Sequence, residues 1–200
     1  DLNLSQDLAA LLDAGVTSFK IEGRLKDKAY VMNITAFYRE RLDRQLNHRG
    51  LQKSSSGACQ PDFTPDPRKT FNRGFTRYFL HGRREPVGSP DTPKSIGEPL
   101  GRVTQLSRSS FRIDGYASVV NGDGLCFFNP QSALVGMAVR QVQGTDIQVD
   151  STAELALGTL IFRNHDQAFL KQLDGSRSLR KIPVRMRLTE TRNGLALFAQ

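Results

Sequence analysis

Residues 20–24 read Lys-Ile-Glu-Gly-Arg and combine side chains that can do acid–base chemistry with one that can bind an anion. If residues 16–22 form a buried strand, Lys20 and Glu22 share one side of it. At the C-terminal end of a barrel strand, Glu22 would be placed to act as an acid, a base or a metal ligand. Arg24 would be placed to clamp an anion. The alternative is a salt bridge from Glu22 to Lys20 or Arg24 that ties the strand to a helix.

Residues 68–84 alternate cations with aromatic rings. The cations are Arg68, Lys69, Arg73, Arg77, Arg83 and Arg84. The aromatic residues are Phe71, Phe75, Tyr78 and Phe79. Cations can neutralise the phosphates of a nucleic acid while aromatic faces stack on unpaired bases. The alternative is that the aromatic residues anchor this segment on the rest of the protein and leave a solvated basic rim.

A second basic cluster lies near the end of the chain and is expected to bind phosphates, or else to form a solvated outer face. Its members are Arg177, Arg180, Lys181, Arg185 and Arg187. The whole chain has 28 basic and 20 acidic residues, a net charge of +8, and a pI near 9.9. This balance excludes an acidic solvating chain and favours a polyanionic partner such as RNA.

Cysteine and histidine usage predicts no metal site within this chain. Cys59 and Cys126 are too few for a disulfide framework or a four-thiolate site, and the three histidines are scattered. We expect Cys126 in the core and Cys59 exposed. Two free cysteines and the lack of an apolar run of about 18 residues favour a cytoplasmic protein with no membrane partner. Because the sequence starts at Asp1 without Met, we expect it to be part of a longer protein.

The elements that must position these residues change in type along the chain. Residues 6–14, capped by Ser5, and a segment from Asp27 to about residue 47 have the apolar spacing of helices on either side of the predicted strand. Pro, Gly and Ser dominate residues 48–66. After residue 100, short runs alternate with turns in the pattern of an antiparallel sheet. These runs are 102–106, 110–113, 124–128, 138–142, 146–149, 159–162, 181–189 and 195–199.

Two local signals refine this reading. Arg192-Asn193-Gly194 between two such runs predicts a hairpin, and residues 166–173 predict one or two helical turns. The predicted fold class is α+β, a C-terminal fragment of an α/β (TIM-like) barrel domain followed by a small antiparallel β-barrel domain. The predicted divisions are 1–48, the end of the α/β barrel, 49–100, a linker and wrapping segment, and 101–200, the β-barrel.

Several blocks resemble the collagenase-like peptidase family U32. The first runs from Leu12 to Lys26, with Tyr30-Val31 and Tyr38-Arg39 after it. The next is Phe71-Asn72-Arg73-Gly74-Phe75-Thr76, followed by Tyr78-Phe79 and Gly82-Arg83. Residues 93–98 and 122–125 continue the resemblance, which covers nearly the whole chain.

The resemblance implies an RNA-modifying enzyme that hydroxylates a cytidine in 23S ribosomal RNA. It also implies an iron–sulfur cluster and a prephenate-related metabolite. The family's cysteine-rich signature is expected upstream of Asp1, so we expect this chain to be inactive alone. Glu22 and Arg24 are the candidate catalytic residues. The candidate RNA-binding residues are Lys26, Arg68, Lys69, Arg73, Arg77, Arg83, Arg84, Arg180, Lys181, Arg185 and Arg187. The alternatives are a peptidase (hydrolase) and a non-catalytic interaction module.

Overall fold

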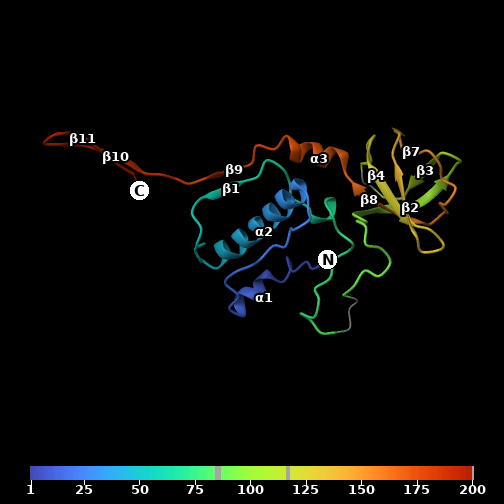
Figure 1. The fold of residues 1–200 in the computed structure, drawn as a ribbon, viewed down its shortest axis with the longest axis horizontal. Helices are drawn as coiled ribbons and strands as arrows, with labels where there is room; N and C mark the ends of the chain where they lie inside the picture. Colours follow the sequence, from blue (N-terminus) through green and yellow to red (C-terminus); the bar gives the residue numbers. More distant parts are fainter. Residues whose placement is uncertain (84–86, 116–117, 200) are drawn as a thin grey trace.

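The computed structural model describes residues 1–83, 87–115 and 118–199 (Figure 1). Its helices are α1 (Leu8–Asp13), α2 (Lys28–His48) and α3 (Gln167–Asp174), with a short 3-10 helix at Pro67–Lys69. Its strands are β1 (Ala58–Gln60), β2 (Glu98–Leu106), β3 (Ser110–Ile113), β4 (Gly124–Phe128), β5 (Leu134–Ala138), β6 (Gln141–Gln143), β7 (Asp146–Gln148), β8 (Leu160–His165), β9 (Leu179–Lys181), β10 (Met186–Thr191) and β11 (Gly194–Ala199). No helix within the described residues is both long and apolar enough to cross a membrane.

The helices largely follow the sequence signals. Asp27 caps α2, as predicted, because its carboxylate accepts a hydrogen bond from the amide of Tyr30 at 2.7 Å. Helix α1 begins later than expected, and the predicted cap at Ser5 is wrong, since Asp7 occupies the cap position. The Asp7 side chain makes no cap hydrogen bond. It instead faces His81, whose Nε2 lies 2.8 Å from Asp7 Oδ1.

The predicted strand at residues 16–22 is wrong. These residues carry no strand assignment, and most of them are exposed. A strand needs a neighbour for its backbone groups, and the described part of the chain offers none beside this segment. The interpretation of residues 1–48 as the end of a TIM-like barrel is therefore not confirmed.

The core lies in a seven-stranded antiparallel sheet of order β5-β4-β8-β2-β3-β7-β6. Phe111, Leu125, Phe127 and Ile161 are almost fully buried within it. The predicted strand at 138–142 is wrong, because the chain here divides into β5 and β6 on either side of Val139 and Arg140. These two strands form opposite edges of the sheet and, in the described pairing, do not bond to each other, so the predicted closed barrel is not confirmed.

Two small strand pairs lie outside this sheet. β1 pairs with β9 beside α2, and β10 pairs with β11 in a hairpin. The hairpin at residues 192–194 is confirmed, but the predicted single run at 181–189 is wrong, because it is split between β9 and β10. Figure 1 shows the hairpin projecting from the body at the end opposite the seven-stranded sheet. The predicted helical turns at 166–173 are confirmed as α3.

Candidate nucleic-acid interface

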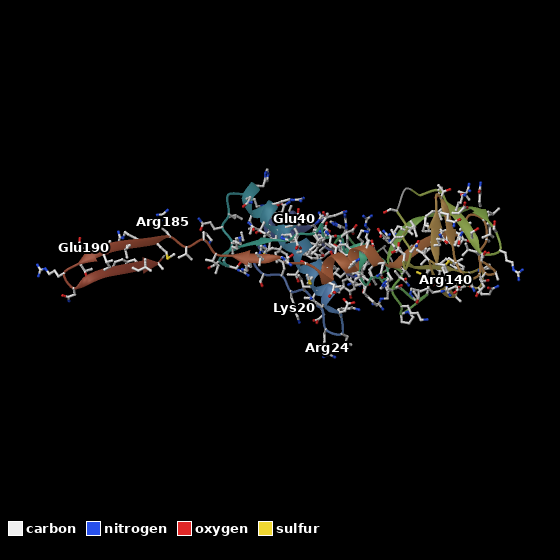
Figure 2. All side chains as sticks on the ribbon, turned by 90° about the horizontal axis from the view of Figure 1, so that it is seen from above. Lys20, Arg24, Glu40, Arg140, Arg185 and Glu190 are labelled. Atoms are coloured by element: carbon white, nitrogen blue, oxygen red, sulfur yellow. The ribbon has the colours of Figure 1, made fainter. Side chains whose placement is uncertain are left out.

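Glu22 and Arg24 are both exposed, and Figure 2 shows Arg24 and Lys20 at the lower edge of the molecule. Glu22 Oε2 lies 3.2 Å from Lys20 Nζ, and both side chains are largely exposed. The amide of Arg24 also donates to the Glu22 carboxylate at 3.4 Å. The hydrogen bond from Lys20, followed by that from Arg24, lowers the pKa of Glu22 below its usual range. Glu22 is therefore ionised at neutral pH, which suits a base or a ligand but not a general acid.

Lys26 connects the segment around Glu22 and Arg24 to the basic aromatic segment, residues 68–84. Its Nζ lies 3.2 Å from the centre of the Phe71 ring and 5.9 Å from that of Tyr30. The Arg73 guanidinium lies 5.8 Å from the same Phe71 ring. Burial, and then the charge of Arg73, lower the pKa of Lys26. Two cations thus approach one aromatic ring, an arrangement that favours a nearby anion.

Two of the predicted cations are bound to carboxylates near the start of the chain. Arg73 Nη2 lies 3.1 Å from Asp1 Oδ1, and Arg77 Nε lies 3.4 Å from Asp7 Oδ2. Residues 1–3 run beside residues 74–76, with a bridge between Leu2 and Thr76. These contacts hold the first segment of the chain against the basic aromatic segment.

Three of the four aromatic side chains of this segment are more exposed than an anchoring role requires. Phe75, Tyr78 and Phe79 each retain 42% or more of their accessible surface. The Tyr78 and Phe79 rings lie 4.1 Å apart, and Arg83 lies 5.3 Å from the Phe79 ring. Exposed rings beside cations can stack on unpaired bases. Arg84 lies outside the described residues.

Lys69 and Arg68 are already engaged inside the protein. Lys69 is largely buried, and its ammonium group contacts Asp166 and, at 3.2 Å, Glu98. Arg68 forms a two-pronged pair with Asp66, with Nη2 2.7 Å from Oδ2. Lys69 is thus a structural cation, whereas the Arg68 side chain remains more than half exposed.

Sequence reasoning missed the centre of this buried ion network. The Arg163 side chain is 6% exposed, and it bonds Glu98 at 2.9 Å and Asp123 at 3.0 Å. Burial alone would lower the pKa of Arg163, but the hydrogen bonds that it donates to Glu98 and Asp123 raise it. The sequence did hold a signal for this burial. Side chains alternate along β8, so Arg163 lies on the same side of the strand as the buried Ile161.

The second basic cluster lies on and around β9 and the β10–β11 hairpin. Arg180 donates from Nε to the carbonyl of Ser56 at 3.0 Å, while Lys181, Arg185 and Arg187 are exposed. Figure 2 shows Arg185 at the base of the hairpin, away from Lys20 and Arg24. Arg185 therefore lies apart from the exposed segment that carries Lys20 and Arg24.

The described residues contain no group of three histidine, cysteine or acidic side chains that could hold a metal ion. Cys126 is buried, and burial raises the pKa of its thiol to about 11, whereas Cys59 is exposed. A cluster ligand must be a thiolate, so the buried Cys126 does not fit as a ligand of an iron–sulfur cluster.

Comparison with known proteins gives one family and several relatives. The model of peptidase family U32 matches residues 1–89. The 23S rRNA 5-hydroxycytidine synthase of Escherichia coli (strain K12) is 46% identical over 126 residues, which cover 62% of this chain and 19% of that protein. A tRNA hydroxylation protein of Bacillus subtilis (strain 168) is 41% identical over 49 residues, 24% of this chain and 16% of that protein.

A collagenase of Porphyromonas gingivalis is 25% identical over 150 residues, covering 72% of this chain and 40% of the collagenase. No solved structure matches the chain. The aligned region thus spans about a fifth of the length of the Escherichia coli relative and less than half of the collagenase.

Proposed function

We propose that this chain, whose residues 1–89 match the model of peptidase family U32, is part of an enzyme that hydroxylates a cytidine in 23S ribosomal RNA. The observation that carries the proposal is the 46% identity to the Escherichia coli synthase over 126 residues. The tRNA hydroxylation relative supports the same class of reaction. A substrate in ribosomal RNA also favours a cytoplasmic location.

In this proposal two basic surfaces hold the RNA through its phosphates. The first consists of Lys26, Arg68, Arg73, Arg77 and Arg83, beside the exposed rings of Phe75, Tyr78 and Phe79. The second consists of Arg180, Lys181, Arg185 and Arg187. Exposed cations can neutralise phosphates and release counterions, which makes binding fall steeply with salt.

Glu22 and Arg24 would contribute to a catalytic site that the rest of a longer enzyme completes. Apolar side chains exposed around them support a site that is completed by further contacts. Ile21, Leu25 and Val31 retain 40%, 92% and 46% of their accessible surface. We propose that residues 1–48 close an α/β barrel through this surface. The ionised Glu22 carboxylate would act there as a base or ligand, and Arg24 would hold an anionic group such as a carboxylate of a prephenate-related metabolite.

We propose that an iron–sulfur cluster is held by cysteines from other parts of the enzyme, because the two cysteines of this chain are too few to bind one. We also propose that the seven-stranded sheet acts as a small barrel. Its edge strands β5 and β6 are consecutive in the chain, which brings the two ends of the sheet together through Val139 and Arg140.

Mass spectrometry of ribosomal RNA tests the proposed reaction. In a strain that lacks the full-length gene, one cytidine of 23S rRNA should lose the mass of one oxygen atom. The full-length protein should restore it, and a Glu22→Gln variant should restore less. Unchanged rRNA in the deletion strain would contradict the proposal.

Peptidase activity is the second candidate, favoured by the match to the collagenase over 150 residues. Full-length protein incubated with collagen and casein should leave both intact if the proposal is right. Cleavage that Glu22→Gln abolishes would favour the peptidase. A protein partner retained after nuclease treatment, with neither activity, would favour an interaction module.

A further inference from the structure

The β10–β11 hairpin is a projecting ribbon with two chemically different faces. Its register places Arg187 opposite Phe198 and Leu188 opposite Leu197. Because side chains alternate along each strand, Arg187, Thr189 and Phe198 share one face. We call this the Arg187 face. The other face carries the apolar side chains of Met186, Leu188, Leu195 and Leu197.

Positive charge is concentrated on the ribbon and on the segment that leads to it. Residues 177–199 hold six of the 28 basic residues and one of the 20 acidic residues. This segment therefore carries +5 of the net charge of +8. Among the described ion pairs none involves these six cations, whereas many cations elsewhere in the chain are paired with carboxylates. A polyanion is the partner whose charge complements this segment.

The Arg187 face also presents an aromatic ring to solvent. Phe198 retains 48% of its accessible surface. The Arg187 guanidinium lies 5.4 Å from the centre of the Phe198 ring. An exposed ring beside a guanidinium can bind the flat face of a nucleobase, while the guanidinium also reaches a phosphate. Aliphatic side chains on the opposite face offer no such stacking surface.

We propose that the Arg187 face binds an unpaired nucleotide of RNA, with its base stacked on Phe198 and the adjacent phosphates near Arg185 and Arg187. This inference rests on the RNA-modifying function proposed above, and it specifies single-stranded RNA as the form recognised by the ribbon. Base stacking on a side chain requires a base that is already out of its own stack. The major groove of an RNA duplex is too deep and narrow for side chains to read its bases.

Fluorescence of a modified base tests the stacking directly. The full 200-residue chain is titrated into a short single-stranded RNA that carries one 2-aminopurine, and into the same RNA annealed to its complement. We expect quenching and tight binding with the single strand and weaker binding with the duplex. Phe198→Leu should reduce the affinity about tenfold and remove the quenching. Phe198→Tyr, which keeps the ring, should retain both.

Leu197→Ala is the matched control, because it shortens a neighbouring side chain on the opposite face of the same ribbon. It should leave affinity and quenching unchanged. Equal losses in Leu197→Ala and Phe198→Leu would mean that ribbon integrity alone matters, and this would overturn the stacking proposal. A ribbon-dependent dimer that excludes RNA, measured by sedimentation, would overturn it in favour of a second copy.

The two proposals fail in different ways. If the chain binds no RNA at low salt, the proposed RNA-binding function of the chain fails. If it binds RNA with a steep salt dependence, but Phe198→Leu binds and quenches like the original chain, only the ribbon inference fails.

Discussion

At the scale of single residues, Arg163 is the most deeply buried cation among the described residues, and it contacts three carboxylates. It contacts Glu98, Asp123 and Asp166, which come from β2, the turn before β4 and the cap of α3. Buried carboxylates are stable only with a charge partner and hydrogen bonds. One guanidinium therefore holds three parts of the sheet unit together.

We predict that Arg163→Met destabilises the chain by about 3–5 kcal/mol, because it leaves buried carboxylates without their main partner. Urea unfolding followed by circular dichroism measures the change. Arg140→Met is the control, since its pair with Asp150 is exposed on both sides and contributes little. Similar midpoints for the two variants would contradict a structural role of the buried network.

The same network predicts acid sensitivity. Burial alone would raise the pKa of Asp166, but the hydrogen bond from Lys69 and the one from the amide of Phe169 lower it. A carboxyl whose pKa is lower in the folded state stabilises the fold above its unfolded pKa, which is near 4. That contribution is lost as the pH falls through the lower, folded pKa.

We therefore expect the free energy of unfolding to fall as the pH is lowered below about 4, and to fall less steeply in Asp166→Asn. Urea titrations at a series of pH values measure both slopes. Identical slopes in the two proteins would show that other carboxyls account for the acid sensitivity.

At the scale of elements, the sequence predicted what local signals determine. Helix α2 begins after the cap that Asp27 predicts, and the β10–β11 turn forms where Asn193-Gly194 predicts it. Residues 16–22 have the composition of a strand, but strand formation depends on a partner that composition does not reveal. The sequence could not predict the ion pairs of Lys69 either, because its partners Glu98 and Asp166 lie 29 and 97 residues away in the chain.

The ribbon provides an element-scale prediction. Deletion of residues 182–200 should leave the unfolding of the seven-stranded sheet unchanged, because β10 and β11 pair only with each other in the described part of the chain. The deletion also removes Arg185, Arg187 and Arg192, so RNA binding should weaken. At about 0.7 per phosphate contact, the slope of log K against log salt should fall by about 2. An unchanged slope would place the RNA on the other basic surface alone.

At the scale of the whole molecule, Lys69 links the helical part to the sheet. It is the last residue of the 3-10 helix at Pro67–Lys69, which Asn33 of α2 holds through hydrogen bonds to Asp66 and Thr70. Its ammonium group reaches Glu98 and Asp166 on the sheet side. Phe63 also makes an edge-to-face contact with Phe169 of α3, the helix that directly follows β8.

We predict that Lys69→Met weakens the coupling of the two parts. On heating, the helical part and the seven-stranded sheet should then unfold at different temperatures. Circular dichroism at a helix-sensitive wavelength, and NMR signals of the sheet core, follow the two parts on heating. A single shared transition in Lys69→Met would show that the aromatic contact suffices. Arg68→Met is the control, since Arg68 pairs locally with Asp66.

The ribbon has a practical consequence for anyone handling the purified chain. Within the described residues, neither of its strands has a neighbour at its outer edge, and four aliphatic side chains lie on one of its faces. Free strand edges beside apolar surface are the usual starting points of aggregation. We expect preparations to lose monomer faster as they are concentrated, and storage with a polyanion to slow that loss.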